Sequence, residues 1–432
     1  MFTKKTIRDI DLEGKIVLLR ADYNVPINEF GAIGDDYRIK QSLPTIQYLL
    51  DKSAKIVICS HLGRPKNAQD ASCSLSPISV RLSEILGRPV GFASDCVGNE
   101  VSAKVDQMQP GDILLLENVR YHPEEESNDP VFAESLARSC KAEVFVQDGF
   151  GVVHRAHAST DGVTKFLPSV SGLLLEREVD TITRAMENPE RPLMAVIGGA
   201  KIADKIEILN KFIDIADFVA IGGAMANTFL LAEGISIGSS LADKEDIQIA
   251  KDIMDKAREK QKQGNFVFYL PQDGVVATSL DKNAQTRIVD WDAHVIADIE
   301  NYPKQPGDKA SKVDVDEKIL DIGPFSGSFI AGGMQLAKTV VWNGAMGVTE
   351  TTSLQGPIGP FSHGTELIVD AMIGQFGHKP FSVVGGGDTV SYIEARGLMD
   401  HFNHVSTGGG ASLELMSGRT LPGVAALQER DS

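Results

Sequence analysis

The sequence predicts an α/β protein with two lobes, each built on a doubly wound, mainly parallel sheet. Short apolar runs recur along the chain, and they are continuous rather than alternating, as in strands that are buried on both faces. Segments with helical periodicity lie between these runs, and such alternation of strand and helix indicates a parallel sheet covered by helices. Because the alternation occurs in both halves of the chain, we expect one Rossmann-like sheet in each half.

The strands are predicted from the apolar runs in chain order. In the first half they cover residues 15–19, 54–60, 112–118 and 143–148. In the second half they cover residues 193–199, 217–223, 266–273, 339–344 and 381–387. In open parallel sheets, ligands bind beyond the carboxyl ends of the strands, so the residues that follow each strand are the candidates for function.

Two segments between the strands carry clear helix signals. In residues 76–87, Ser76 is expected to cap a helix that has Pro77 at its first position and stops at Gly87. In residues 201–216, apolar residues at helical spacing are expected to share one face, namely Ile202, Ile206, Leu209 and Ile213.

A further helix is predicted near the middle of the chain, in residues 171–192. It has an apolar stripe, made of Leu175, Val179, Ile182 and Met186, and the prolines at 189 and 192 end it. We interpret it as a linker helix between the two lobes. The alternative is one more peripheral helix within a lobe.

Composition excludes several classes of function. The chain has 42 Lys and Arg against 59 Asp and Glu, a net charge of −17, which argues against non-specific nucleic-acid binding. A membrane span would need a run of about 18 apolar residues, and the sequence contains none. Its first 15 residues also lack the apolar stretch of a signal peptide. The four cysteines form no CxxC pair, so we expect neither a thiolate metal site nor a disulfide framework, and a cytoplasmic location.

Basic side chains follow all four predicted strands of the first half. Arg20, Asp22 and Asn24 come after the first strand, and the later strand ends and loops supply Arg38, His61, Arg64, Arg120, His154, Arg155 and His157. One loop arginine is usually solvated, but arginines at four successive strand ends of an acidic chain need another explanation. Because guanidinium groups bind carboxylate and phosphate in two-pronged fashion, the pattern predicts a pocket for a small, multiply charged anion.

Glycines follow the predicted strands of the second half, in "GGAK", "GGAM", "NGAMG", "GGGDT" and "STGGGAS". Such turns allow close approach of the backbone to a ligand and offer helix N-termini to phosphate, although tight turns also favour glycine for purely structural reasons. Lys201 and Lys205 are expected to share one face at the start of a helix, where two cations are unfavourable unless a polyphosphate binds there. Asp388, which could instead cap its helix, is the candidate for Mg²⁺. Glu350 is a weaker candidate for ribose hydroxyls.

Two common nucleotide-binding signatures are missing from the sequence. There is no GxxxxGK[ST] motif and no strand-linked GxGxxG motif followed by an acidic residue about twenty positions later. The P-loop NTPase and dinucleotide-dehydrogenase interpretations are therefore disfavoured.

Nine motifs, taken together and in order between residues 20 and 423, resemble the phosphoglycerate kinase family. They are "RADYNVP", "SHLGRPK", "ENVRYHPEE", "DGFGVVHRAHAS", "GGAKIADKI", "LDIGP", "WNGAMGVTE", "VVGGGDT" and "STGGGASLELMSGRTLPG". The resemblance implies a 3-phosphoglycerate lobe (residues 1–172), a linker helix (173–190), a nucleotide lobe (191–405), and a hinge with a final segment (406–432) that returns to the first lobe.

The resemblance also implies the roles of individual residues and the reaction. The substrate site would hold Asp22, Asn24, Arg38, His61, Leu62, Gly63, Arg64, Arg120 and Arg155. The site for Mg-ATP or Mg-ADP would hold Lys201, Lys205, Gly323, Glu350, Gly385, Gly386, Gly387, Asp388 and Thr389, with Asp388 toward the metal. Arg38 and Lys201 are the candidate catalytic residues for in-line phosphoryl transfer between 1,3-bisphosphoglycerate and ADP. A monomer that closes at a hinge is expected.

The sequence departs from the family pattern at a few positions. Gly149 replaces the usual Ala, Val152 and Val153 replace a Thr-Ala pair, Ala345 replaces Pro, and Thr349 replaces Phe. The stretch around residues 285–318 is longer than usual and is expected to be a surface elaboration of the nucleotide lobe. Two other interpretations stay open, another kinase of acidic metabolites and a lapsed homologue that only binds. The ordered motifs argue against the first, and the presence of Arg38, Lys201 and Asp388 argues against the second.

Overall fold

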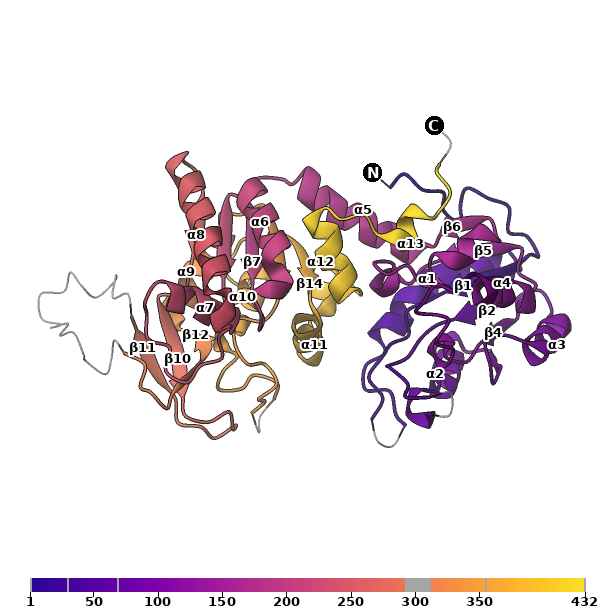
Figure 1. Cartoon of the computed structure of the whole chain (residues 1–432), viewed down its shortest axis with the longest axis horizontal. Coiled ribbons are helices and arrows are strands. Elements are labelled where there is room, and N and C mark those ends of the chain that lie inside the picture. The colour runs from indigo at the N-terminus through magenta and orange to yellow at the C-terminus, as the bar shows by residue number, and fades with distance from the viewer. Residues whose placement is uncertain (1, 29–30, 68–69, 292–311, 354–355, 431–432) are drawn as a thin grey trace, which may run out of the picture. The chain divides into compact units, whose positions relative to one another are not determined.

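The computed structural model describes residues 2–28, 31–67, 70–291, 312–353 and 356–430. The chain forms two compact units, one made of Met1–Ile182 with Gly410–Ser432 and the other of Thr183–Gly409. Each unit contains a six-stranded parallel sheet with flanking helices, which confirms the predicted fold class (Figure 1). Among the described helices, none is both long enough and apolar enough to cross a membrane.

The sheet of the first unit has the strand order β3-β4-β2-β1-β5-β6, and every pair is parallel. Its strands are β1 (Ile16–Arg20), β2 (Lys55–Cys59), β3 (Gly91–Phe92), β4 (Ile113–Leu115), β5 (Val144–Gln147) and β6 (Ser169–Ser171). The helices within this unit are α1 (Tyr37–Asp51), α2 (Ser76–Leu86), α3 (Asn99–Gln107), α4 (Pro130–Ser139) and α13 (Pro422–Ala425). The sequence did not predict β3 and β6, because runs of two or three residues give too little periodicity to recognise.

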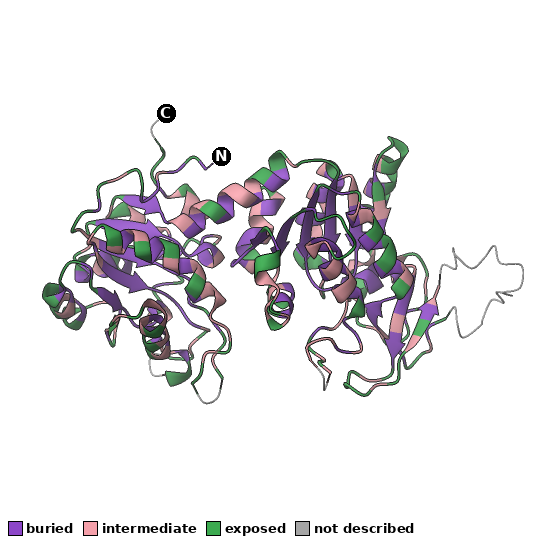
Figure 2. Ribbon diagram, turned by 180° about the vertical axis from the view of Figure 1, so that it is seen from behind, coloured by how far each residue is buried: buried purple, intermediate pink, exposed green. Residues whose placement is uncertain are grey.

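Both faces of this sheet are buried, as the continuous apolar runs require. Successive strand residues point to opposite faces, so Val17 and Leu19 join one core cluster with Ile46 of α1, whereas Leu18 joins the other with Leu136 of α4. Helices α1 and α2 therefore cover one face and α3 and α4 the other. Apart from the short edge strand β3, the strands are mostly buried, while the helices show alternating buried and exposed residues (Figure 2).

The sheet of the second unit has the strand order β15-β14-β13-β7-β8-β9, again parallel throughout. Its strands are β7 (Leu193–Ile197), β8 (Phe218–Ile221), β9 (Val267–Tyr269), β13 (Thr339–Asn343), β14 (Phe381–Gly385) and β15 (His404–Val405). The helices of this unit are α6 (Ile206–Ile215), α7 (Met225–Ala232), α8 (Ile247–Lys262), α9 (Pro324–Met334), α10 (His363–Ile373) and α11 (Gly387–Ala395). Helix α12 (Gly409–Ser417) begins at the division between the units.

A small antiparallel sheet in the second unit was not predicted. It has the order β11-β10-β12, formed by β10 (Asp273–Ala277), β11 (Arg287–Asp290) and β12 (Lys318–Ile322). The strand predicted for residues 266–273 is divided between β9 and the start of β10, with Pro271 between them, because proline cannot donate to a strand ladder.

The long stretch around residues 285–318 is anchored at both ends in the small sheet. Arg287 of β11 donates from Nε to Glu317 Oε1 at 2.7 Å, and Val289 and Val313 pack with Val276 in one buried cluster. Residues 292–311 lie outside the described residues, so the predicted surface elaboration stays a prediction there.

Two of the predicted helix starts were wrong. Helix α2 begins at Ser76 itself, with Leu75 as its N-cap residue, although Gly87 follows its end as predicted, at φ 63°. In residues 201–216 a short 3₁₀ turn, Ala203–Lys205, precedes α6, which begins at Ile206. Lys201 is therefore not helical, and the argument that it shares a helix face with Lys205 does not hold.

The predicted middle helix is α5 (Leu173–Glu187), which runs across the division between the units. All four residues of its apolar stripe are buried: Leu175, Val179, Ile182 and Met186. Its first turn is held by Asp148, which follows β5. Asp148 Oδ1 accepts hydrogen bonds from Leu174 N at 3.0 Å and Leu175 N at 3.2 Å.

The buried carboxyl group of Asp148 predicts a specific pH dependence of stability. Burial raises its pKa to about 7 from 3.8, so the stability contributed by the neutral acid is complete below pH 3.8 and is lost as the pH rises through about 7. The Asp148→Asn variant keeps an acceptor at Oδ1 but cannot ionise. We expect its free energy of unfolding to fall less with rising pH than that of the wild type, by up to a few kcal/mol. Urea unfolding of the wild type and the variant at pH 5 and pH 8 measures this difference. An equal pH dependence in the two proteins would contradict the prediction.

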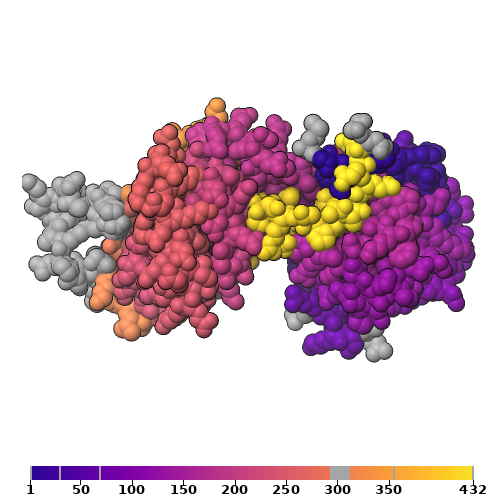
Figure 3. Space-filling view, turned by 45° about the horizontal axis from the view of Figure 1, so that its top comes forward, coloured from indigo at the N-terminus to yellow at the C-terminus, as the bar shows by residue number. Residues whose placement is uncertain are grey.

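The C-terminal residues lie against the N-terminal residues of the same unit (Figure 3). Lys5 N donates to Gln428 O at 2.8 Å, and Lys4 Nζ donates to Leu427 O at 3.1 Å. Gly423 N donates to Val153 O at 2.9 Å, next to the loop that follows β5. The end of the chain thus supports a loop that carries candidate site residues.

Candidate active site

In the first unit, the loops after β1 and β2 and the first turn of α1 bring several predicted residues together. Arg38 was expected in a loop but lies in α1. Arg38 Nη1 donates to Asp22 Oδ2 at 3.1 Å and to Asn24 O at 3.0 Å. Asn24 Oδ1 accepts a hydrogen bond from Gly63 N at 2.8 Å, which ties the two loops to each other. His61 lies in the same group, with its Nδ1 3.9 Å from Asp22 Oδ1.

Arg120 joins this group from the loop after β4. It lies in a 3₁₀ turn, Val119–Tyr121, that is capped by the Asn118 side chain. Arg120 Nη1 donates to Gly63 O at 2.8 Å, and its Nε lies 3.2 Å from Glu126 Oε1. Burial lowers the pKa of Arg120, and the charges of Arg20 and Arg155 lower it further.

The histidines of the group are held in the neutral form by their surroundings. Burial lowers the pKa of His61 well below 6.5, and the charges of Arg20, Arg120 and Arg38 add to this effect. Burial also lowers the pKa of His157 to about 4. The arginines that lower these pKa values also repel one another. A bound anion would relieve this repulsion.

The remaining residues predicted for this site differ in exposure. Arg155 is exposed and donates from Nε to His154 Nε2 at 3.2 Å, but its charge is felt at Arg120 and His157. Arg64 is exposed and Leu62 is buried.

Gly149 and Val152, which depart from the family pattern, lie close together beside this group. A Cβ on Gly149 would lie 3.4 Å from Val152 Cγ2 and 3.3 Å from Asp22 N. The loop after β5 is thus packed closely on the backbone of Asp22. Gly149 and Val152 both affect this contact.

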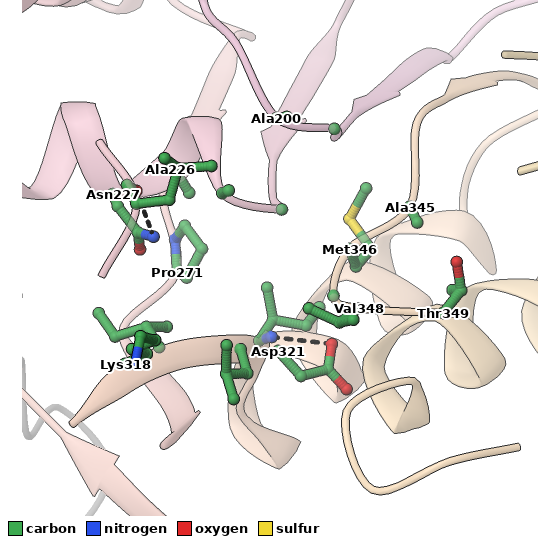
Figure 4. A pocket seen from close by; sticks show the side chains of 18 of the residues that line it. Ala200, Ala226, Asn227, Pro271, Lys318, Asp321, Ala345, Met346, Val348 and Thr349 are labelled. Carbon is green, nitrogen blue, oxygen red and sulfur yellow. Dashed lines mark hydrogen bonds between the residues drawn. The ribbon is translucent and has the colours of Figure 1, made fainter. Parts of the chain in front are cut away.

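The second unit contains a cavity of about 660 Å³ at the carboxyl ends of its strands. Ala226, Asn227 and Pro271 lie on one side of it, and Ala345, Met346 and Thr349 on the other (Figure 4). Two predicted nucleotide residues, Glu350 and Asp388, also line this cavity. Small and apolar side chains form most of the wall, which suits a flat heterocyclic base rather than a highly charged group.

The lysines predicted for this site occupy different environments. Lys201 is exposed, whereas Lys205 is buried and donates from Nζ to Asn343 Oδ1 at the end of β13. Burial lowers the pKa of Lys205 to about 8, although the charges of Asp204 and Asp388 act to raise it. Lys205 is therefore a cation that a polyphosphate would stabilise.

The lowered pKa of Lys205 predicts proton uptake when a nucleotide binds. At pH 8.5 most Lys205 side chains are neutral, and a neighbouring phosphate would restore the charged form. We expect uptake on the order of half a proton per nucleotide, and less at pH 7.5. Calorimetric titration with ADP in buffers of different ionisation enthalpy measures it. Uptake that does not increase between these two pH values would count against this role.

The glycines at the strand ends serve two different purposes. A Cβ on Gly198 would lie 2.2 Å from Ala345 O, and one on Gly344 would lie 2.3 Å from Gly198 O, so these glycines allow backbone segments to pack on each other. Gly387 faces open space in the first turn of α11, where a ligand could approach. Gly198 and Gly344 are therefore explained by backbone packing and need no ligand. Thr389 Oγ1 accepts a hydrogen bond from Gly344 N at 2.9 Å, which fixes the turn after β13.

Two buried carboxylates in the cavity wall were missed by the sequence analysis. Asp273 accepts hydrogen bonds from Phe325 N and Ser326 N, both at 2.9 Å, and Asp321 Oδ2 accepts one from Gly364 N at 2.8 Å. Both acids thus hold the first turns of helices, α9 and α10, and burial raises the pKa of Asp321. They also explain Gly323, where a Cβ would lie 2.1 Å from the Asp273 carboxyl group. The sequence contained a signal for both acids, since Asp273 ends a predicted strand and Asp321 interrupts the apolar run at residues 319–322.

Asp388 is better placed to bind a metal ion than these two acids. It is exposed, lines the cavity and lies in the first turn of α11. The carboxyl groups of Asp273 and Asp321 already accept hydrogen bonds from backbone N–H groups. A carboxylate that is free to act together with nucleotide phosphates fits the preference of Mg²⁺.

One group of possible metal ligands lies outside both sites in the described part of the chain. Asp95, Cys96 and His122 have ligand atoms within 4.8 Å of one another. His122 Nε2 lies 2.7 Å from Asp95 Oδ1, so these two side chains already satisfy each other. All four cysteines are buried and unpaired with one another.

Comparisons with known proteins agree with the motifs. A family model described as "Phosphoglycerate kinase" matches residues 7–419. Proteins named phosphoglycerate kinase from Dictyoglomus turgidum and Moorella thermoacetica are 44% and 43% identical to this chain, each covering 99% of it and 100% of the relative.

Solved structures agree as well. The structure of phosphoglycerate kinase from Coxiella burnetii matches with a TM-score of 0.78 at 35% identity, over 98% of both chains. The structure of the Pyrococcus horikoshii enzyme also gives a TM-score of 0.78, at 28% identity, over 99% of this chain and 98% of that one.

Proposed function

Because this chain belongs to the phosphoglycerate kinase family, we propose that its first unit binds the phosphoglycerate and its second unit binds the nucleotide. As a member of the family, it is a kinase that transfers a phosphoryl group reversibly between ATP/ADP and 3-phosphoglycerate in glycolysis. In our proposal the phosphoryl group of 1,3-bisphosphoglycerate passes to ADP, which leaves 3-phosphoglycerate and ATP. We further propose a cytoplasmic monomer.

The convergence of basic side chains in the first unit is the observation that carries this proposal. Arg38 at the start of α1, His61 after β2 and Arg120 in the 3₁₀ turn after β4 meet around Asp22 and Gly63. A substrate with a carboxylate and a phosphate would neutralise them, and Asp22 and Asn24 would accept hydrogen bonds from its hydroxyl group. Arg64 and Arg155, which are exposed, would add donors at the rim.

In the second unit, the cavity would hold the base and ribose, and Lys205 with the first turn of α11 would hold the phosphates. Asp388 and the nucleotide phosphates would together hold Mg²⁺, which supplies neutralisation of phosphate charge when it is bound. Glu350 lines the same cavity and would accept hydrogen bonds from the ribose hydroxyls.

The transfer itself needs positioning and charge neutralisation more than covalent chemistry. Arg38 and Lys201 would contact the phosphoryl group in flight, one from each unit. The acceptor of the reverse reaction is a carboxylate, so no general base is required, and a neutral His61 acts as a hydrogen-bond donor. Because reacting atoms must approach to about 3–3.5 Å, we propose that the units close on each other by a hinge at α5 and near residue 406.

A coupled assay of ATP-dependent 1,3-bisphosphoglycerate formation from 3-phosphoglycerate tests the proposal. Turnover that requires Mg²⁺ is expected. If no turnover is seen although both ligands bind in calorimetry, the lapsed-homologue interpretation replaces it, and the departures at Gly149 and Ala345 become the first positions to revert. If the enzyme phosphorylates a different acidic metabolite more efficiently, the substrate assignment is wrong.

A further inference from the structure

Arg20 is fully buried behind the candidate substrate site, although it follows β1 like the candidate ligands. It is 1% exposed and is among the largest buried side chains in the described residues. Its Nε donates to Ser159 Oγ at 2.7 Å, and its Nη1 donates to Ala21 O. Its Nη2 lies 3.3 Å from His61 Nδ1. A buried cation in this position must be held by an anion or by acceptors.

Ser159 links Arg20 to the buried carboxyl group of Glu125. Glu125 is 0% exposed. Its Oε1 accepts a hydrogen bond from Ser159 Oγ at 2.6 Å and its Oε2 accepts one from Ser159 N at 2.9 Å. Burial raises the pKa of Glu125 above its ordinary value, although the charge of Arg20 and the two bonds from Ser159 act to lower it. The order of donation is therefore from Arg20 to Ser159 and from Ser159 to Glu125.

The contact between Arg20 and His61 determines where the imidazole carries its proton. A guanidinium group has only donors, so His61 Nδ1 must accept the hydrogen bond from Arg20. The neutral ring then carries its proton on Nε2. Protonation of both nitrogens would place an imidazolium against Arg20 in a buried environment, which is strongly unfavourable.

We propose that Glu125 and Ser159 are positioning residues that act through Arg20 to keep His61 as the neutral tautomer with its proton on Nε2. This inference rests on the proposed function, in which the ring offers a donor to the anionic phosphoglycerate. The other neutral tautomer would present a lone pair at Nε2 and repel the oxygens of the substrate. A buried ion pair is weak evidence for stability, so a role in selecting one state of the site explains this arrangement better.

The tautomer can be read directly from nitrogen-labelled histidine by long-range NMR of the ring nitrogens in the free wild-type enzyme. We expect an unprotonated Nδ1 and a protonated Nε2 for His61, assigned with His61→Gln. Ser159→Ala removes the link, and Ser139→Ala is the matched control, since buried Ser139 also accepts a hydrogen bond, from Gly98 N at 2.8 Å, away from the network. Glu125→Gln provides a second variant that keeps the shape of the side chain.

We expect Ser159→Ala and Glu125→Gln to mix the two tautomers and to raise KM for 3-phosphoglycerate about tenfold, with kcat changed much less. Ser139→Ala should change neither. The proposal is overturned if wild-type His61 carries its proton on Nδ1, or if the variants match Ser139→Ala in both tautomer and KM. Failure of the proposed function would appear differently, as absence of 3-phosphoglycerate turnover by a wild type that still shows the expected tautomer.

Discussion

Arg38→Ala and Lys201→Ala should each lower kcat for 1,3-bisphosphoglycerate formation at least about a hundredfold, because each removes a cation from the charge that develops in transfer. The Arg38 side chain donates hydrogen bonds to Asp22 and to the Asn24 carbonyl, and it is 29% exposed, so its guanidinium can reach a ligand. Lys201 is exposed and precedes the turn that carries Lys205. The coupled assay at saturating substrates measures the effect.

A control near Arg38 separates this role from a loss of general positive charge. Lys40 lies two residues further along α1 and pairs with Asp36 at 2.7 Å, with a side chain that is 54% exposed. Lys40→Ala should change kcat less than about twofold, since exposed pairs of this kind contribute little. If Arg38→Ala changed only KM, Arg38 would bind the substrate equally in ground and transition states and would not be a catalytic residue.

The sequence predicts the two parallel sheets well because strands buried on both faces leave continuous apolar runs. It predicts the basic group of the first unit for a related reason, since parallel strands bring their carboxyl ends to one edge. Residues far apart in the chain, such as Asn24 and Arg120, therefore meet at Gly63. This inference needs only topology and no side-chain detail.

The parts that were missed depend on contacts that leave no periodic signal. Lys201 precedes the 3₁₀ turn that contains Lys205, and α6 begins only after it, although the apolar spacing there is the same as in a continuous helix. The polar segment "HPEEESND" gives no indication that Glu125 is buried. Only the fold shows that it is fully buried beside Ser159. Asp273 and Asp321 likewise hold helix starts that are distant in sequence.

The glycines of the second unit give the other large effect. We expect Gly198→Ala to lower the free energy of unfolding by about 3 kcal/mol or more. Its Cβ would lie 2.2 Å from Ala345 O and 2.7 Å from Gly344 O. Both are backbone atoms, and Ala345 O is also fixed by a hydrogen bond from Gly199 N at 3.0 Å, so neither can move without separating β7 from β13. Urea unfolding measures the change.

Gly332→Ala is the matched control, because Gly332 lies within α9 and a Cβ there would meet open space. It should be neutral or stabilising by up to about 1 kcal/mol, as expected for alanine in a helix.

The backbone contact between Gly198 and Ala345 also affects the cavity, because Ala345 and Gly199 line it. Gly198→Ala should therefore also raise KM for ATP while leaving KM for 3-phosphoglycerate nearly unchanged. A variant as stable as wild type would mean that the segments after β7 and β13 can separate at little cost, and the cavity wall would then be more adaptable than its backbone packing indicates.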